Sequence, residues 1–554
     1  MQIAESRQRL GVWLGALFLT VLGAKLWLVQ LYGSPLPLWD QWYEAAAFFQ
    51  PWMSGHLSWR DFFTPFNEHR ILFTKLLDLT LIKLNGRWEP MLQMTVNCFI
   101  YAGYACALAA IIWKLFGRTQ AWLICCLLAP LYALPYAGES TLWAINSLQY
   151  LTSVFALGAI AGLGFAKAGS PRWWLGLISG IAGLFTMASG FLAATAVIGP
   201  LLLRTLKNRR LERSDAITFG VCVALIAAGL AMQVSMREDI PLRAHTFGQF
   251  IVALAHNLAW PFVEHFQFLW IVPLAPLALL LFFYFRGNFP ASRGAEFLLG
   301  MALWSGLQST ALAFGRANYG DGFPASRYMD VLNILVMADI FALMLLVPIF
   351  AHREPRLVPL APLVFAGIMF FQMGKVSQIV VDQLLLPTRM MNLAAEEQVE
   401  HFMATGDEQE FLKPPTVRPD AKMVLGLLKN EALRPILPGI CQPPGQRPPP
   451  NRLALPTNWL LQNAPLILGF GLSLFVALCG SGLARRALGL PRDNLGGVLA
   501  LLTAVTMLGF VWSRAGLTRH SVEYGLQQQL ARYFLDHNDP QRAAIHAAKA
   551  QKLR

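Results

Sequence analysis

Charged residues are scarce in this chain: Asp, Glu, Lys and Arg make up 14% of its 554 residues, whereas soluble globular proteins carry about 25%. Hydrophobic residues make up 56%. Many apolar runs reach the length of about 20 residues that crosses a bilayer core. The composition therefore excludes a soluble domain and predicts an all-α polytopic membrane protein.

Cysteine patterns are also missing. The seven cysteines show neither the paired spacing of a zinc site nor a disulfide framework, and all but Cys441 lie in apolar stretches, where cysteine behaves as a small hydrophobic residue. The net charge of +13 comes from basic residues in short loops between apolar runs. That distribution fits topology signals and contact with membrane lipids, and it does not indicate a nucleic-acid partner.

The apolar runs predict about 13 transmembrane helices. We place them at roughly 10–31, 91–116, 120–137, 146–166, 172–188, 190–204, 215–234, 267–285, 295–314, 328–350, 357–374, 460–482 and 495–513. We expect an uncleaved first helix with a cytoplasmic N-terminus. Alternating sides from there places every basic loop in the cytoplasm. The same count places residues 32–90, 316–330 and 375–459 together on the exterior face.

Four parts follow from this topology. Residues 1–374 form a transmembrane catalytic module with a first exterior loop at 32–90. Residues 375–459 form a proline-rich exterior loop or small cap, 460–513 contain two further spans, and 514–554 form a polar tail. Within these parts we expect local helices at 40–54 and 68–84 (both interfacial), 421–430 and 522–535.

The first exterior loop carries acids among tryptophans. Asp40 and Glu44 are four residues apart, which places them on one face of a short helix. A carboxylate at a membrane interface can act as a general base toward a hydroxyl when desolvation raises its pKa. The two are therefore candidate catalytic residues. The alternative is a pair of solvated loop acids.

The same loop contains four consecutive polar residues, Asn67-Glu68-His69-Arg70. His69 and Arg70 can donate hydrogen bonds to a phosphate, and Glu68 can hold either donor or contact the substrate. The alternative is a polar start to a helix, with Glu68 near the positive end of its dipole.

Two later exterior loops complete the candidates. Arg316 and Arg327 flank a glycine-rich loop and can grip a phosphate from both sides, although arginines also snorkel at helix ends. Polar and aromatic side chains suited to sugar hydroxyls accompany them, and helix capping explains part of this set equally well. The members of this set are Glu139, Trp143, Gln149 and Tyr328.

These motifs resemble those of the GT-C class of membrane glycosyltransferases. The similar segments are Trp39-Asp40-Gln41-Trp42, Asn67-Glu68-His69-Arg70-Ile71, Glu139…Trp143…Gln149 and Ala325-Ser326-Arg327-Tyr328. They look like segments of bacterial multi-pass proteins that use polyprenyl-phosphate sugars. The likeness in architecture covers most of the chain, whereas the similar motifs are short and scattered.

The resemblance implies an inverting transferase. It would move a sugar from a polyprenyl-phosphate carrier to a hydroxyl of a glycan, lipid or protein, on the periplasmic face of a bacterial inner membrane. It implies that Asp40 is the general base. Arg70, Arg316 and Arg327, with His69, would hold the carrier phosphate.

A divalent metal is the only candidate cofactor. Some members of the class hold one with an Asp-x-Asp pair, but Asp40-Gln41-Trp42 lacks the second aspartate. Glu44 or Glu139 could substitute for it. The alternatives to a glycosyltransferase are a transporter or flippase of a lipid-linked sugar, a transferase of another group, and a non-catalytic subunit of an envelope-glycan assembly complex.

Overall fold

The structure, a computed structural model, describes residues 2–116, 121–262, 267–286, 292–318, 324–350, 360–414, 419–446, 451–487, 519–537 and 539–553. All regular secondary structure in these ranges is helical, so the predicted all-α class is confirmed. The principal helices are α1 (Gln2–Tyr32), α2 (Asp40–Glu44), α3 (Gln50–Met53), α4 (Leu72–Asn85), α5 (Pro90–Leu115), α6 (Ala121–Ala133), α7 (Gly138–Leu142), α8 (Ser147–Leu163), α9 (Pro171–Gly183), α10 (Leu192–Asn208), α11 (Arg213–Ala231), α12 (Phe247–Ala259), α13 (Ile271–Phe285), α14 (Ser292–Gly315), α15 (Met329–Phe350), α16 (Ala361–Val380), α17 (Leu386–Thr405), α18 (Glu408–Phe411), α19 (Ala421–Lys429), α20 (Ala454–Gln462), α21 (Ala464–Ala487), α23 (Arg519–Asp536) and α24 (Pro540–Lys552).

Within the described ranges, eight helical segments are long and apolar enough to cross a membrane. A ninth forms if the bent pair α20 and α21 is one span. The chain is thus a polytopic helical membrane protein. The expected number of about 13 spans is not confirmed, because α9, α10 and α13 have only 13, 17 and 15 residues. The expected span at 495–513 lies outside the described residues.

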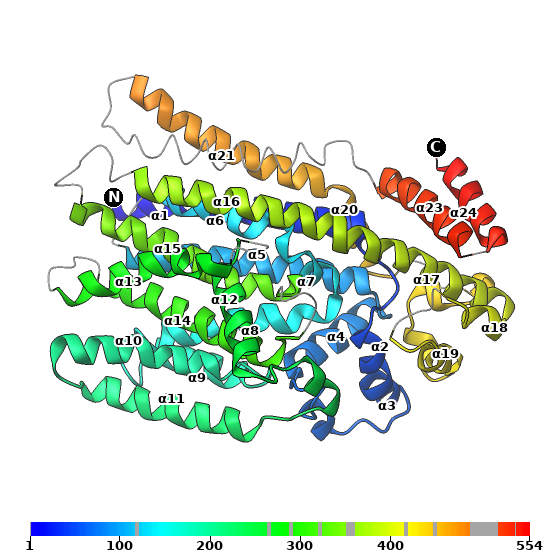
Figure 1. Ribbon diagram of the computed structural model, residues 1–554, viewed down its shortest axis with the longest axis horizontal. Helices are drawn as coiled ribbons and strands as arrows, with labels where there is room; N and C mark the ends of the chain where they lie inside the picture. Colours follow the sequence, from blue (N-terminus) through cyan, green and yellow to red (C-terminus); the bar gives the residue numbers. More distant parts are fainter. Residues whose placement is uncertain are drawn as a thin grey trace.

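The long helices form one bundle with its two ends clearly separated (Figure 1). Within it, α1 packs against α5, α6 and α21. Small residues permit the closest approach: a Cβ on Gly23 would lie 2.3 Å from the backbone nitrogen of Leu468. Backbone contacts of this kind are typical of membrane helices, where dispersion contacts replace much of the hydrophobic driving force.

A second hydrophobic core lies at the end of the bundle where α2 to α4 meet α17 and α19. Trp42, Phe49 and Trp88 stack edge to face in this core, and Val399 and Leu428 belong to the same cluster. The predicted proximity of segments 32–90 and 375–459 is therefore confirmed.

Local helices in this core follow the sequence signals. Residues 40–53 form one continuous helical segment, as expected. The expected helix at 68–84 begins later, as α4, and ends at Gly86, whose φ of 85° favours glycine. The helix expected at 421–430 is α19, with Asp420 as its N-cap.

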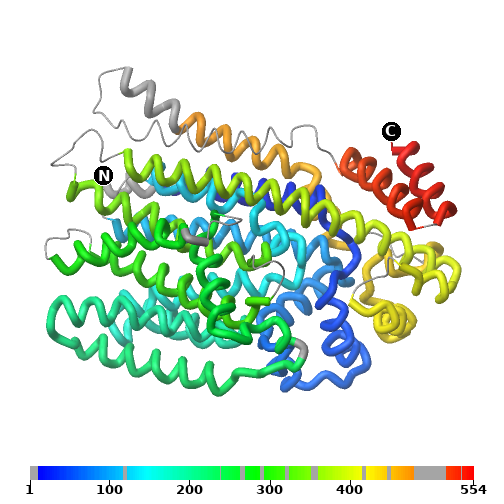
Figure 2. Tube along the Cα trace, viewed as in Figure 1, coloured from blue at the N-terminus to red at the C-terminus, as the bar shows by residue number. Residues whose placement is uncertain are grey.

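The expected boundary at 374–375 falls inside a helix. α16 continues through a π-helical turn, Val381–Leu385, into α17, so residues 361–405 form one rod that joins the bundle to the second core. The predicted helix at 522–535 is α23, which pairs with α24 beside α17 (Figure 2). Arg389 of α17 holds α23 against α17, because its buried guanidinium forms ion pairs with Glu396 of α17 and Glu523 of α23.

Candidate functional site

A cavity of about 560 Å³ lies at the end of the bundle where segment 32–90 is located. Its volume falls within the range of small-ligand sites. Its walls come from five stretches of chain: 68–69, 187–192, 233–243, 307–316 and 328–331, with Gln149. Of the residues singled out in the sequence, Glu68, His69, Gln149, Arg316 and Tyr328 line it.

Part of the cavity wall lies where the chain turns between the short helices α9 and α10. The 13 residues of α9 extend about 20 Å, less than the roughly 30 Å of a hydrocarbon core. The chain turns back at 184–191, where a Cβ on Gly190 would lie 1.8 Å from the carbonyl oxygen of Gly183. Non-helical backbone in a membrane protein is tolerated where it lines a cavity. Here Ala188 and Ser189 do so.

A tight turn carries Glu68 into the cavity. Phe66 and His69 exchange backbone hydrogen bonds of 2.7 and 3.0 Å, which leaves Asn67 and Glu68 at the tip of the turn. Asn67 has a φ of 50°, a conformation that asparagine tolerates better than most residues. This geometry explains why polar residues interrupt the apolar sequence here.

His69 is fixed beside Glu68. Its Nδ1 accepts a hydrogen bond from the Ala188 N–H at 3.1 Å, and its Nε2 lies 3.8 Å from Glu68 Oε1. Burial lowers the pKa of His69, so its neutral form carries the proton on Nε2, toward Glu68. Burial opposes the charge of Glu68, but His69 and the Arg316 guanidinium outweigh it and hold the pKa of Glu68 at about 2.

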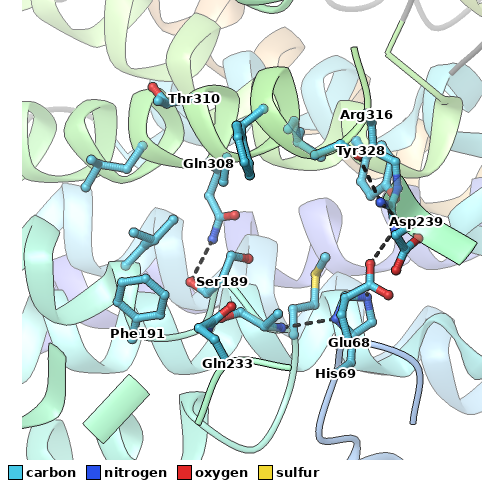
Figure 3. Close-up of a pocket in the computed structure, with 18 of the residues that line it drawn as sticks. Glu68, His69, Ser189, Phe191, Gln233, Asp239, Gln308, Thr310, Arg316 and Tyr328 are labelled. Atoms are coloured by element: carbon cyan, nitrogen blue, oxygen red, sulfur yellow. Dashed lines mark hydrogen bonds and ion pairs between the residues drawn. The ribbon is translucent and has the colours of Figure 1, made fainter. Parts of the chain in front are cut away.

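Arg316 is held by two carboxylates at one end of the cavity (Figure 3). It forms an ion pair with Glu68 and, through Nη1, a second with Asp239 at 3.2 Å. The Tyr328 hydroxyl also hydrogen-bonds to it. Burial and the adjacent Glu68 raise the pKa of Asp239. Arg243 lines the same end and donates to Ser235 Oγ at 3.0 Å.

The rest of the wall is neutral. Gln308 points across the cavity toward Ser189, donating to its carbonyl oxygen at 3.5 Å (Figure 3). The Ser189 hydroxyl is buried without a hydrogen-bond partner among the described residues. Gln149 accepts from Ser140 Oγ at 3.2 Å. Apolar side chains complete this side, namely Phe191, Leu192, Leu307, Leu312 and Phe314.

Asp40 lies beside the cavity, not in its lining. It begins α2, directly after Trp39, whose φ of 46° is unusual for a tryptophan. Its carboxylate accepts a hydrogen bond from Asn67 and lies in the fields of Arg327 and Glu68. Burial raises the pKa of Asp40. Backbone strain of this kind concentrates at functional sites, and here it occurs next to both Asp40 and Glu68.

Arg327 is held by Glu139. Its Nη1 donates to Glu139 Oε1 at 2.5 Å, and its guanidinium lies over the rings of Trp143 and Tyr328 at 5.6 and 4.9 Å. The Trp143 indole N–H donates to the carbonyl oxygen of Leu38 at 3.1 Å, which ties this cluster to the start of α2. None of Arg327, Glu139 and Trp143 is part of the cavity lining.

Glu44 and Arg70 also lie away from the cavity. Glu44 is 1% exposed, and its carboxyl group lies beside that of the equally buried Asp78 of α4. Burial raises the pKa of Glu44 to about 7. Arg70 donates to the carbonyl oxygens of Phe63 at 2.8 Å and Met232 at 3.4 Å. It thereby joins segment 32–90 to the end of α11.

The site does not match a metal centre. No group of three or more His, Cys, Asp or Glu side chains that could hold a metal occurs in the ranges that the structure describes. The two carboxylates closest to that role, Glu68 and Asp239, hold Arg316 instead. The divalent metal considered from the sequence is therefore not supported by these residues.

Sequence reasoning did not identify Asp239, Arg243, Ser189 or Gln308. The charged stretch that follows α11, Arg237-Glu238-Asp239, lies on the same side of the predicted topology as the other candidates and could have indicated Asp239. Ser189 and Gln308 carry no such signal, because single polar residues are common in membrane helices. Comparisons with family models, curated proteins and solved structures found no match to this chain.

Proposed function

We propose that this protein is a membrane glycosyltransferase that moves a hexosyl or pentosyl group from a polyprenyl-phosphate carrier to an acceptor hydroxyl. The supporting observation is the cavity sunk into the bundle, with a charged end at Arg316 and an apolar wall, directly beside Asp40. An amphiphilic donor requires this combination, because its phosphate needs cationic donors and its lipid chain needs an apolar surface.

Asp40 acts as the general base. The acceptor hydroxyl gives its proton to the Asp40 carboxylate while its oxygen bonds to the anomeric carbon, and the bond from that carbon to the carrier phosphate oxygen breaks with its electron pair. A single displacement inverts the configuration. In this proposal Arg316, Arg243 and the Nε2–H of His69 stabilise the negative charge that develops on the leaving phosphate.

The cellular setting belongs to the same proposal. In this proposal the basic loops lie in the cytoplasm, and the cavity, segment 32–90 and the tail lie on the periplasmic face of a bacterial inner membrane. The acceptor would be a glycan, lipid or protein of the cell envelope, for example a lipopolysaccharide.

Transfer of a radiolabelled sugar from a polyprenyl-phosphate-sugar pool by the purified protein in lipid tests the proposal. Loss of a general base lowers the reaction rate by about 10²–10⁴-fold. The transfer rate of Asp40→Asn should therefore be at least about 100-fold below that of wild type, while donor binding persists. Because burial raises the pKa of Asp40 and the base works when deprotonated, transfer should fall as the pH drops through that raised pKa. Near-normal transfer by Asp40→Asn would refute the assignment.

A transporter or flippase of a lipid-linked sugar is the second candidate. Lys25 and Asp339 are buried within helices long enough to span the membrane, and charges in such positions often mark transport pathways. A proteoliposome assay that follows movement of a polyprenyl-phosphate sugar between leaflets separates the two. Movement that survives Asp40→Asn, without transfer by either form, favours transport.

A further inference from the structure

The charges at Arg316 have the arrangement of a cation site. Glu68 and Asp239 come from segments of chain 171 positions apart in the sequence, and both place a carboxylate on the one guanidinium. The Arg316 side chain is 18% exposed, and its Nη1 also donates to the carbonyl oxygen of Gly315 at 3.0 Å. Two carboxylates around a single positive centre in a cavity wall is an arrangement that divalent metal sites also use.

The net charge at this end of the cavity also matches a metal site. Arg243 lies in the same lining, and its charge acts on Asp239. With both carboxyl groups ionised, two guanidiniums balance two carboxylates. A divalent cation between the same two carboxylates would give the same total. The two guanidiniums can therefore supply the cationic donors that a phosphate needs without a metal ion.

From this geometry we infer that the guanidinium of Arg316, positioned by Glu68 and Asp239, takes the place of a divalent cation at the donor phosphate. The inference rests on the proposed function for its role in transfer, but not for the site itself. Arginine suits this position because its planar fork engages two carboxylates or a phosphate while remaining charged. Glu68 and Asp239 are positioning residues, since they act through Arg316.

Removal of the guanidinium should expose the latent cation site. We expect Arg316→Ala to bind Mn²⁺, measured by loss of the free-ion electron paramagnetic resonance signal with the purified full-length protein. Removal of a supporting group typically lowers metal affinity by about 10–100-fold. The double variant Arg316→Ala/Glu68→Gln lacks one of the two carboxylates and should bind Mn²⁺ at least about tenfold more weakly than Arg316→Ala. Wild type should also bind it at least about tenfold more weakly than Arg316→Ala, because its own guanidinium occupies the position.

Matched variants keep the test decisive. Arg316→Lys retains a positive charge and should not bind Mn²⁺. Arg316→Gln replaces Arg316→Ala if the latter fails to fold, as judged by size-exclusion chromatography and thermal unfolding. The inference is overturned if neither neutral variant binds Mn²⁺, or if wild type binds it at a site that Glu68→Gln removes.

A second measurement separates this inference from the proposed function. With a polyprenyl-phosphate sugar as donor, wild-type transfer should be insensitive to EDTA, whereas Arg316→Ala should lose transfer and regain part of it when Mn²⁺ is added. Mn²⁺ binding by Arg316→Ala without transfer by any form would retain the cation-site inference and reject the glycosyltransferase. EDTA-sensitive wild-type transfer would reject the inference and retain the enzyme.

Discussion

Buried carboxyl groups near the cavity differ in their electrical surroundings, residue by residue. The adjacent His69 and the Arg316 guanidinium overcome burial at Glu68 and keep the pKa of its carboxyl low, whereas burial raises the pKa of Asp40. Environments that separate the pKa values of neighbouring acids are typical of acid–base sites. This difference supports the proposal that Asp40 is the base, with Glu68 as a partner of Arg316.

The Glu44–Asp78 pair should make stability depend on pH. Glu44 has a folded pKa of about 7 against an ordinary value of 4.5, so the folded protein binds its proton more tightly than the unfolded chain does. The stabilisation is complete below pH 4.5 and is lost as the pH rises to 7, by an amount on the order of 3 kcal/mol. We expect wild type to unfold at a lower temperature at pH 8 than at pH 5.

Glu44→Gln should remove the part of this pH dependence that Glu44 contributes, because an amide does not titrate, while Asp78, whose pKa burial also raises, continues to titrate. Thermal unfolding in detergent from pH 5 to pH 8 measures it. Glu408→Gln is the control, because Glu408 is 48% exposed and paired with Lys429. An unchanged slope in Glu44→Gln would show that the pair does not hold a shared proton.

Polar side chains that interrupt apolar stretches could be predicted as site residues from the sequence. Side chains that reach the site only through tertiary packing could not. Glu68, His69, Arg316 and Tyr328 are unusual in their local context, and the structure brings them into one cavity. Asp239 joins them only because the segment after α11 returns to this end of the bundle. That placement depends on tertiary contacts with no local signature.

At the level of elements, glycines decide how closely α8 and α9 pack. A Cβ on Gly162 would lie 2.5 Å from the Cα of Gly176, so the two backbones touch. This contact supports the turn at 184–191, which forms the floor of the cavity. The interruption at Ala188-Ser189-Gly190 is visible in the sequence, but the length of the break is not, because it depends on packing between helices.

Gly162→Ala should therefore destabilise the protein by about 1–3 kcal/mol, the usual cost of overpacking. Gly103→Ala on α5 is the matched control, since no atom lies within 4 Å of a Cβ built there. The control should be neutral or slightly stabilising. Thermal unfolding of the two variants checks the difference, and equal stability would contradict the close packing of α8 on α9.

At the scale of the whole molecule, composition predicted the all-α class, and the alternation of predicted spans across the membrane predicted which segments lie at the same end of the bundle. The structure brings segments 32–90 and 375–459 together at one end of the bundle, as expected. The turn between α10 and α11 lies at the other end. The number of spans could not be obtained from apolar runs alone, because α9, α10 and α13 are shorter than a standard span.

The predicted orientation can be tested by labelling introduced cysteines. His56→Cys should react with a membrane-impermeant maleimide in cells whose outer membrane is permeabilised. Arg210→Cys, in the turn after α10, should react only after the inner membrane is disrupted. Both positions are exposed, so reaction of both without disruption would contradict the predicted orientation.

The central claim is that a polyprenyl phosphate occupies the cavity beside Asp40, and site-specific photo-crosslinking tests it most directly. Phe191, in the lining, and Phe219, which is 39% exposed on α11, are each replaced by p-benzoylphenylalanine. Irradiation with radiolabelled polyprenyl phosphate should give an adduct at position 191 that excess unlabelled carrier removes, and no such competed adduct at 219. Equal adducts at both positions, or none that competes at 191, would contradict the account.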